Sequence, residues 1–513
     1  MSHLVDRILR VPSVLLCLVC GLCLSGCGQQ ATLFNVAKSA EESTKTESTT
    51  DSLGLDSVID QLQTLSPIAV PAEVQNGLEQ ANEALRKLER MKRSNREAIR
   101  DANRQVRVMN PARSPNIVMI VAPRLAANDL GVYGQEPTIT PNLDRMAENG
   151  VRFLSFHGAS PDPLASRWSL LTGQLPSQAD EEAEPRFQLR NSRCNVAETL
   201  WQAGYDTGFI GVWGAPDNAP LDTPLNHGFD EWMGVLPYSA MDDPTPDNIW
   251  LGEEQPLQPI AQNNAQPGFT AGDLFVRESL RFFRTQRGGR RPFYLQLHLP
   301  NYMGYPAALL DRIPPTRDGL GQTANRYAAG LMMMDQDVGR ILSGLEVLGL
   351  TNRTAVFFTA FTGPDPNNAA ALNGLGSLGP YQFAPHGLGQ ANLQVPLIAR
   401  FPGFFPTNRL GLPPAVVWDL HPTLAELAWA IQKPTFLPGT SLMPEIYGRR
   451  ELAERVLYWR YRMAQAARLG PWKAVKSAGV NDVLLYDLVN DPGERTDVAA
   501  EHPEIVNRLT IAE

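Results

Sequence analysis

From residue 115 onward, short uninterrupted apolar runs alternate with longer stretches that have helical periodicity. Apolar runs of this kind are typical of strands that are buried on both faces of a parallel sheet. The runs cover residues 116–121, 206–212, 293–299, 354–359 and 396–401. The helical patterns cover residues 141–149, 195–203, 329–348 and 420–431. This alternation predicts an α/β fold with a doubly wound, mostly parallel sheet over residues 115–450.

A β-like run at residues 151–156 leads through a turn of Gly, Pro, Ser and Asp into a helical stretch that opens at Ser166. Ser166 is a good N-cap residue for that helix. A strand that feeds a helix N-terminus through a tight loop is a ready anion site, because backbone N–H groups and the positive end of the helix dipole point at one spot. Arg167, in the first turn, adds a planar set of donors that suits sulfate or phosphate. An ordinary turn with a surface arginine is the alternative interpretation.

The order of residues here resembles the signature of the type I sulfatases, in which Cys or Ser, any residue, Pro, Ser, Arg, two residues and Leu-Leu-Thr-Gly open a helix after a strand. Ser166, Arg167 and residues 170–173 match that signature, which puts the nucleophile position at Pro163 and the signature proline at Ala165. In the family the Cys or Ser is oxidised to formylglycine, whose hydrated form attacks sulfur. Proline has no thiol or hydroxyl to oxidise, so the resemblance implies the family's fold without its nucleophile.

Further matches to the family extend from about Pro115 to the C-terminus, roughly four fifths of the chain. They fall at residues 140–144, 149–153, 203–207, 228–231, 327–329, 337–342 and 419–424. From about residue 453, short strand patterns follow at 455–461, 465–468, 472–476 and 483–488, before a last helix at 503–511. This part resembles the family's small C-terminal subdomain, an antiparallel sheet with one helix, here residues 451–513. The resemblance therefore implies the fold of the alkaline phosphatase superfamily.

The residues that follow the predicted strands differ from those that the family uses to hold Ca²⁺. Sulfatases place two consecutive Asp after the first strand, and here that strand is followed by Pro123 and Arg124. The family's next two ligands, an Asp with Asn or His, fall on Phe361 and Thr362. A calcium ion needs several oxygen ligands, most of them carboxylates. Asp365 would be a lone ligand, so we expect this chain to lack both the calcium ion and the formylglycine of the family.

The other polar positions of the family's site are changed as well. The family's Lys-Trp-His trio falls on residues 212–214, a later His falls on residues 300–301, and a late Lys falls on residues 385–386. Of the polar groups that surround the substrate in the family, only Arg167 is retained in kind. The resemblance therefore implies a catalytically degenerate member.

Two alternatives to a lost activity remain open. A shift of the alignment offers Asp162, Ser160 or Ser166 as the nucleophile of a sulfuric or phosphoric ester hydrolase with a rearranged site. In the second alternative, Arg167, Arg124 and Ser166 at the helix N-terminus hold an anion, such as the sulfate of a sulfated polysaccharide, without cleaving it.

Arg124 also has a purely structural interpretation, in which it pairs with a nearby acid such as Asp129 or points to solvent. The histidines have no metal-ligand spacing, so we interpret them as individual core or turn residues. They are His157, His227, His298, His386 and His421.

The N-terminal segment is typical of a bacterial lipoprotein. A short basic region precedes an apolar run at residues 11–24, which is too short to span a bilayer comfortably, and residues 24–27 resemble a lipobox. The sequence therefore predicts a signal peptide over residues 1–27 with lipid on Cys27. A plain signal peptide with a coincidental cysteine is the alternative. After cleavage, Cys194 would be the one cysteine besides Cys27, which excludes an internal disulfide.

Two segments precede the α/β region. Residues 28–71 have the polar composition of a disordered tether. Residues 72–110 are charged but carry apolar residues at helical spacing, which predicts a long helix. That helix would pack on the globular domain, act as a spacer or form a coiled-coil stalk.

The net charge of −9 does not indicate a nucleic-acid partner. We expect a lipid-anchored protein of the bacterial cell envelope, located in the periplasm, in the outer membrane or at the cell surface. Its expected partners are the membrane, through Cys27, and a sulfated polysaccharide or another protein. The expected role is that of a binding or scaffold lipoprotein derived from a sulfatase.

Overall fold

The computed structural model describes residues 114–510, apart from 136–138, 177–188, 190–194, 216–222, 247–248, 253, 258–268, 315–318, 385–386, 431–436, 451 and 478–481. These residues belong to one compact unit, Ser94–Glu513. The predicted signal peptide with Cys27, the tether and the helix at 72–110 lie outside the described residues, as do Cys194 and His386. None of the described helices combines the length and the apolar character that a membrane span requires.

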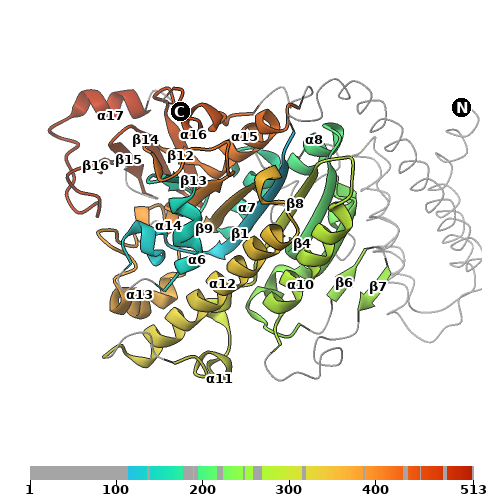
Figure 1. Ribbon diagram of the computed structural model, residues 1–513. Coiled ribbons are helices and arrows are strands. Elements are labelled where there is room, and N and C mark those ends of the chain that lie inside the picture. The colour runs from blue at the N-terminus through green and yellow to red at the C-terminus, as the bar shows by residue number, and fades with distance from the viewer. Residues whose placement is uncertain are drawn as a thin grey trace, which may run out of the picture. The chain divides into compact units, whose positions relative to one another are not determined.

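The described part of the chain is built around a ten-stranded sheet of order β11-β2-β10-β9-β1-β8-β4-β5-β6-β7 (Figure 1). Its strands are β1 (Asn116–Arg124), β2 (Val151–Phe153), β4 (Asp206–Ala215), β5 (Glu231–Pro237), β6 (Ile249–Leu251), β7 (Glu254–Leu257), β8 (Phe293–His298), β9 (Thr354–Thr362), β10 (Leu397–Arg400) and β11 (Arg409–Gly411). The five central strands β9, β1, β8, β4 and β5 run parallel. The predicted mostly parallel sheet is confirmed.

The central strands are apolar because both faces of the sheet are covered. Every residue of β8 and β9 is buried, and so is every residue of β1 except Arg124. The run at residues 396–401 also forms a strand, but β10 lies antiparallel to both of its neighbours, β9 and β2. The expectation of a parallel strand there was wrong, because burial on both faces fixes the apolar character of a strand and not its direction.

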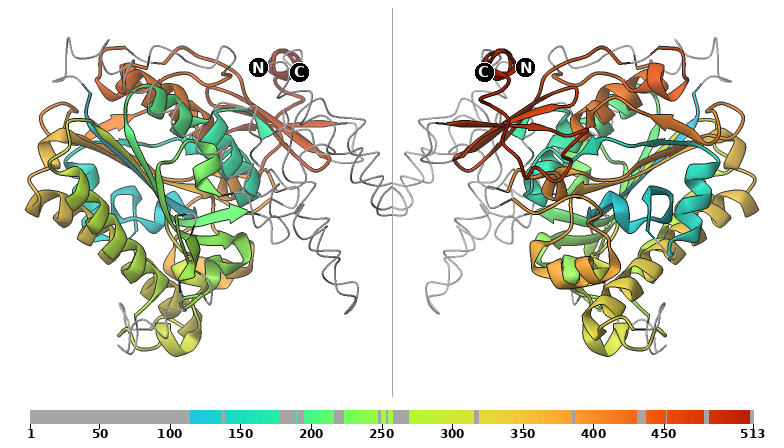
Figure 2. Two further views of the ribbon diagram at one scale, coloured as in Figure 1. Left: turned by 90° about the vertical axis from the view of Figure 1, so that its right-hand side faces the viewer. Right: turned by 90° about the vertical axis from the view of Figure 1, so that its left-hand side faces the viewer.

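Helices cover the two faces of the sheet, with α10 and α12 on one face and α7, α8 and α15 on the other (Figure 2). The helices of this region are α6 (Pro141–Glu148), α7 (Pro163–Thr172), α8 (Val196–Gln202), α10 (Ala271–Gln286), α11 (Ala307–Leu310), α12 (Gln322–Val347), α13 (Ala369–Leu375), α14 (Gln390–Leu393), α15 (Leu420–Leu427) and α16 (Met443–Ile446). The four predicted helical patterns correspond to α6, α8, α12 and α15. The last of these ends at Leu427, four residues before the predicted end.

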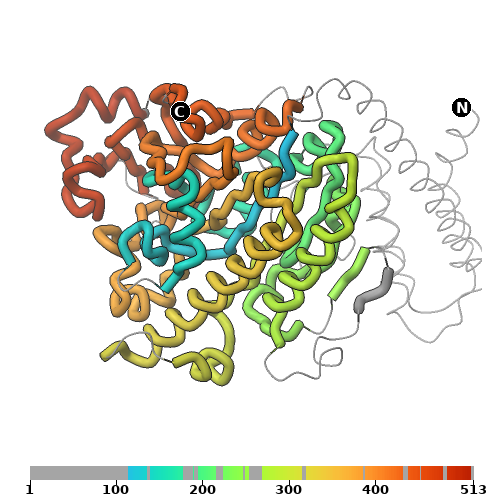
Figure 3. Tube along the Cα trace, viewed as in Figure 1, coloured from blue at the N-terminus to red at the C-terminus, as the bar shows by residue number. Residues whose placement is uncertain are grey.

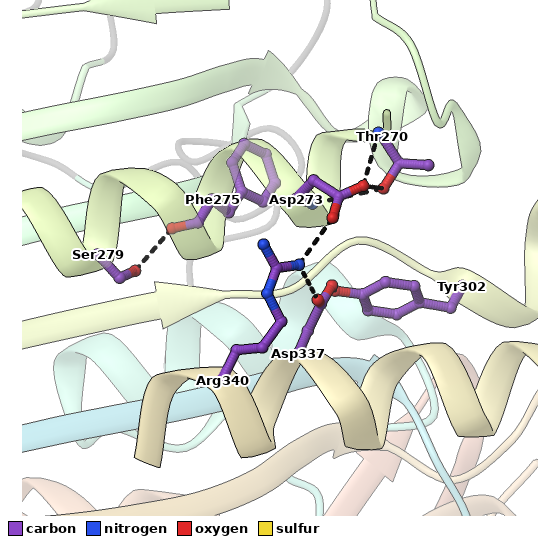
Figure 4. Close-up of polar contacts among 7 residues, drawn as sticks. All are labelled: Thr270, Asp273, Phe275, Ser279, Tyr302, Asp337 and Arg340. Carbon is purple, nitrogen blue, oxygen red and sulfur yellow. Dashed lines mark hydrogen bonds and ion pairs between the residues drawn. The ribbon is translucent and has the colours of Figure 1, made fainter. Parts of the chain in front are cut away.

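An arginine on α12 ties the outer helices together (Figure 4). Arg340 donates hydrogen bonds to Asp273 on α10, at 2.7 Å, and to Asp337, at 2.8 Å. The hydroxyl of Tyr302 also donates to Asp337, at 2.6 Å. Tyr302 belongs to the segment that follows β8, so this cluster fixes the path of the chain just beyond Asn301.

The C-terminal part forms a separate four-stranded antiparallel sheet, of order β13-β14-β15-β16, with one helix. Its elements are β13 (Leu457–Tyr461), β14 (Ala464–Leu469), β15 (Trp472–Lys476), β16 (Val483–Asp487) and α17 (Pro503–Thr510). Figure 3 follows the chain from the blue β1 to this red end. A two-stranded parallel pair, β3 (Phe156–His157) and β12 (Ala415–Val416), completes the strands. The predicted antiparallel sheet with a helix is confirmed.

Candidate functional site at the carboxyl edge of the sheet

The candidate site lies where the central parallel strands end. Arg124, Thr362 and His298 are the last residues of the adjacent strands β1, β9 and β8, and Arg124 pairs in register with Thr362. In an open α/β sheet this carboxyl edge is where ligands bind. The side chains at the strand ends, and in the segments that follow, therefore decide what chemistry the site can perform.

Arg124 forms an ion pair with Asp365, which follows β9. The two side chains are 26% and 23% exposed, so the pair is largely shielded from water. The suggested pairing of Arg124 with Asp129 was wrong. Asp129 is fully buried and accepts hydrogen bonds from the backbone N–H of Ala126 and the hydroxyl of Tyr327, both at 2.9 Å. Burial raises the pKa of Asp129 to about 6.

Tyr238 is influenced by several charged groups at this edge of the sheet. It follows β5 and begins a short 3₁₀ helix, Tyr238–Asp242. Burial raises the pKa of its phenol, Arg124 lowers that pKa, and Asp162 and Asp242 raise it further. The side-chain amide of Asn301, which follows β8, donates to Asp242 at 2.7 Å. The charges of Arg124, Asp162 and Asp242 therefore all act on the phenol of Tyr238.

The remaining positions aligned with metal ligands carry no free carboxylate. Pro123 is buried within β1. Phe361 is 4% exposed, and its ring meets the ring of His298 edge-on with the centroids 4.9 Å apart. Thr362 is buried, and its hydroxyl donates to the carbonyl of Gly363 at 2.9 Å.

These side chains do not fit a calcium ion. Calcium takes six to eight oxygen ligands, and several of them are normally carboxylates. Pro123 and Phe361 offer no side-chain oxygen, and the guanidinium of Arg124 repels a cation. Among the residues that the structure describes, no group of three or more His, Cys, Asp and Glu side chains is arranged so that it could hold a metal ion.

Helix α7 begins at Pro163, the position aligned with the family's nucleophile. Asp162 is its N-cap, and a side-chain oxygen of Asp162 accepts a hydrogen bond from the backbone N–H of Leu164 at 2.8 Å. The expectation that Ser166 is the N-cap was wrong by four positions. Aspartate is a strong N-cap residue, and proline is favoured at the first helical position, so the Asp-Pro pair starts the helix earlier.

Ser166 lies in the first turn of α7 and fastens the helix to β9. Its side chain is fully buried, and its hydroxyl donates to the carbonyl of Phe361 at 2.5 Å and accepts from the backbone N–H of Ala159 at 2.9 Å. The backbone passes very close at Gly158, where an added Cβ would lie 2.2 Å from the carbonyl oxygen of Phe361. Ser166 therefore has a structural role at the strand end.

We expect Ser166→Ala to lower the free energy of unfolding by about 1–3 kcal/mol, because it removes both hydrogen bonds of the hydroxyl and leaves the buried N–H of Ala159 without this acceptor. Urea-induced unfolding of the purified protein measures this loss. Ser343→Ala is the matched control, because Ser343 lies exposed on α12. Equal stability of the two variants would contradict the structural role of Ser166.

Arg167 is retained from the family signature but faces inward. It is 2% exposed, and its guanidinium carbon lies 4.3 Å from the centre of the Trp213 ring. Gly214 leaves room for it, since a Cβ there would lie 3.2 Å from the Cδ atom of Arg167. Burial lowers the pKa of His298, and the nearby charge of Arg167 lowers it further. Of the two arginines suggested to hold an anion, Arg167 stacks on Trp213 and Arg124 pairs with Asp365.

His421 on α15 holds the other end of α7. Its Nδ1 lies 3.1 Å from the carbonyl of Thr172, to which it donates, and its Nε2 lies 2.9 Å from the hydroxyl of Thr199, from which it accepts. Burial lowers the pKa of His421 from its usual 6.5 to about 4. His157 and His298 are also buried, and burial lowers their pKa values in the same direction.

A buried neutral histidine makes the protein less stable in acid. Below pH 6.5 His421 is protonated in the unfolded chain but stays neutral in the folded protein. The contribution of this group to the free energy of unfolding is therefore highest above pH 6.5 and decreases as the pH falls. We expect this group alone to cost about 2 kcal/mol between pH 7 and pH 5. His421→Gln should reduce the pH dependence of urea unfolding by that amount. An unchanged pH dependence would contradict the buried, neutral state.

Two residues of this edge, Tyr238 and Asp242, were not among the predicted site residues. They were missed because β5 was not among the predicted strands, although its apolar run at residues 232–236 was the available signal. Asp365 was noted only as a lone ligand. Its actual partner, Arg124, is separated from it by 241 positions in the sequence.

Comparison with known proteins identifies relatives of this chain. The family model described as Sulfatase matches residues 115–430. N-acetylgalactosamine-6-sulfatase from Rattus norvegicus is 31% identical over 393 residues, which cover 70% of this chain and 71% of the rat protein. Arylsulfatase A from Homo sapiens is 30% identical over 464 residues, which cover 78% of this chain and 87% of the human protein.

Solved structures share the fold. The crystal structure of Ps i-CgsB in complex with k-i-k-neocarrahexaose superposes with a TM-score of 0.64 at 22% identity, over 77% of this chain and 91% of that chain. At this level of identity the likeness concerns the fold alone.

Proposed function

Since the chain belongs to the sulfatase family, we propose that it is a catalytically degenerate member, which binds or organises a partner and does not cleave sulfate esters. The alternative within the same family is a hydrolase of sulfuric or phosphoric esters with a rearranged site. The two differ in whether the carboxyl edge of the sheet can assemble a nucleophile and a charge that stabilises the transition state.

The observation that carries the proposal is the ion pair between Arg124 and Asp365. Arg124 stands where the family signature calls for a metal-binding carboxylate, and its guanidinium engages the nearest acid of the neighbouring strand end. A bound metal ion contributes several kcal/mol of transition-state stabilisation and can generate the nucleophile. A guanidinium that is already paired cannot activate a nucleophile in this way.

The nucleophile position supports the same proposal. Pro163 is the first residue of α7 and has no side-chain atom that attacks sulfur. Ser166 is the nearest hydroxyl in the helix, and both of its hydrogen-bonding functions are used by backbone groups. Ser160 is 2% exposed, and its hydroxyl accepts the backbone N–H of Asp162 at 3.1 Å. Asp162 is the remaining candidate, and one of its oxygens caps the helix.

The proposed role combines this inactive site with attachment to a membrane through Cys27. The named relatives include an N-acetylgalactosamine-6-sulfatase and an arylsulfatase A. A sulfated polysaccharide is therefore a fitting ligand class for a family member that binds without cleaving. A protein partner in the cell envelope is the other class that fits a scaffold role.

Turnover of 4-nitrophenyl sulfate by the purified protein, with millimolar Ca²⁺ present, tests the proposal. We expect no product above the rate of the buffer, since the site lacks both the nucleophile and the metal. Two variants separate true activity from a contaminating sulfatase. Asp162→Asn keeps an N-cap acceptor but removes the remaining candidate nucleophile, and Ser343→Ala alters only an exposed helix position.

The outcomes are distinct. Turnover that survives in Ser343→Ala and disappears in Asp162→Asn would establish the rearranged hydrolase and overturn the proposal. Turnover that is equal in both variants would come from a contaminant. Absence of turnover in all three proteins is the predicted result.

A further inference from the structure

Arg124 contacts or influences groups from several elements around the carboxyl edge of the sheet. It ends β1, and its ion pair with Asp365 bridges to the segment after β9. It also acts on Tyr238, which follows β5. Burial raises the pKa of that phenol, and the charges of Asp162, the N-cap of α7, and of Asp242 raise it further.

The groups around Arg124 carry an excess of negative charge. Asp365 is in direct contact with it, while Asp162 and Asp242 act on the same phenol. A carboxylate after one strand end that faces a cation at the end of the next strand is an arrangement that a bound divalent ion also makes with its ligands. Here the cation is part of the chain.

We infer that Arg124 is a tethered cation, which joins the ends of β1 and β9 through Asp365 in the place of a bound divalent ion. The inference rests on the proposed loss of the metal site. A guanidinium stays charged at every accessible pH and offers several donors in fixed directions. Unlike a metal ion, it cannot be removed by a chelator or exchanged.

The packing next to Arg124 agrees with this substitution. The Phe361 side chain, at a position where the family signature has a ligand, packs against the ring of His298. Leu125 continues from Arg124 with a backbone hydrogen bond to the carbonyl of Thr362, at 3.0 Å. The ion pair, this backbone hydrogen bond and the contact between the two rings together join the ends of β1, β9 and β8.

Thermal unfolding of the purified full-length protein tests the inference, with EDTA or with millimolar Ca²⁺. We expect the same Tm for the wild type in both solutions. Arg124→Met should lower the Tm by about 3 °C or more, because it leaves Asp365 and its neighbours without a counter-charge. The double variant Arg124→Met with Asp365→Leu should recover part of that loss, since the unpaired acid is then gone.

Two further variants make the result specific. Arg326→Met is the matched control, because Arg326 pairs with Asp311 on the surface, with both oxygens at 2.7 Å and both side chains about a third or more exposed. It should leave the Tm almost unchanged. Arg124→Asp removes the tethered cation and adds a carboxylate among the existing acids. We expect this variant to have a lower Tm than Arg124→Met, because Asp365 then faces a like charge.

Each outcome decides the inference. A wild type that loses Tm in EDTA, or an Arg124→Met variant no less stable than Arg326→Met, would overturn it. An Arg124→Asp variant as stable as Arg124→Met would show that position 124 faces no net negative charge and would overturn the claim that Arg124 takes a metal's place. These melting temperatures are independent of turnover, so cleavage of 4-nitrophenyl sulfate would contradict the proposed function and would be recognised separately.

Discussion

Replacing Lys473 by Met should destabilise the protein by about 3–5 kcal/mol, because it leaves a buried carboxylate without its partner. Lys473 lies on β15 and is 1% exposed, and its Nζ is 2.6 Å from Oε1 of Glu494, which is 6% exposed. Lys473 also donates to the carbonyl of Leu388. Burial lowers the pKa of Lys473, and the charge of Glu494 opposes that shift. Each charge of this buried pair is therefore stabilised by the other.

This pair matters for the candidate site because it fixes the loop that borders it. Oε2 of Glu494 accepts the backbone N–H of Gln390 at 2.6 Å, and Gln390 begins α14. The carbonyl of Asn392, in the same short helix, accepts the backbone N–H of Gly363 just after β9. Lys473 therefore couples the C-terminal sheet, through α14, to the segment that carries Asp365.

Urea-induced unfolding monitored by fluorescence measures the loss in Lys473→Met. The double variant Lys473→Met with Glu494→Gln should recover part of the stability, since no buried charge then stays unpaired. Arg508→Met is the surface control, because Arg508 and Glu454 are 60% and 62% exposed and lie 4.0 Å apart. A loss in Lys473→Met no larger than in this control would show that the pair does not join the two sheets.

Asp419→Ala is the second substitution for which we expect a large effect, again about 3–5 kcal/mol. Asp419 is fully buried and forms an ion pair with Arg455, which precedes β13. Its two oxygens also accept the backbone N–H groups of Val416, at 2.9 Å, and of Thr440, at 2.8 Å. Alanine leaves both of these N–H groups unsatisfied and takes away the counter-charge of Arg455.

Comparison with Asp419→Asn separates charge from hydrogen bonding. Asparagine keeps one acceptor oxygen, so it should lose less stability than alanine in the same urea experiment. Equal losses in the two variants would mean that the acceptor bonds contribute little. Stability close to wild type in both variants would contradict the arrangement around Asp419.

The parts of the fold that were correctly predicted from sequence are those whose residues are buried on both faces. The strands β1, β4, β8 and β9 appear as continuous apolar runs, because each is covered by helices on two sides. The direction of β10 was not predictable in this way, since its apolar residues would be the same in either orientation. The direction of a strand depends on whether the preceding segment of the chain leads to the same edge of the sheet or crosses to the opposite edge.

The start of α7 was signalled by the sequence but was misread. Asp162 followed by Pro163 is a common way to begin a helix, whereas the family signature draws attention to Ser166. The structure gives Ser166 a different task, in which its hydroxyl joins α7 to the end of β9. A local propensity rule was therefore the better guide to the helix boundary, and the signature was the better guide to the family.

The residue types at the candidate site were available from the sequence, but their contacts were not. The absence of carboxylates at Pro123, Arg124 and Phe361 is a property of the sequence alone. The partner of Arg124 cannot be read from the sequence, because Asp365 becomes its neighbour only when β9 pairs with β1. Asp129 was the nearer acid in sequence, but it turns inward to Tyr327.

Elemental analysis of the purified protein tests the central claim most directly. The protein is equilibrated with millimolar Ca²⁺, passed through a desalting column and analysed for bound metal. The replacement of the family's ligands by Arg124 and its neighbours predicts calcium and zinc far below one equivalent per chain. One tightly held equivalent of either metal, lost on denaturation, would contradict a degenerate site in which a guanidinium stands where the family binds its cation.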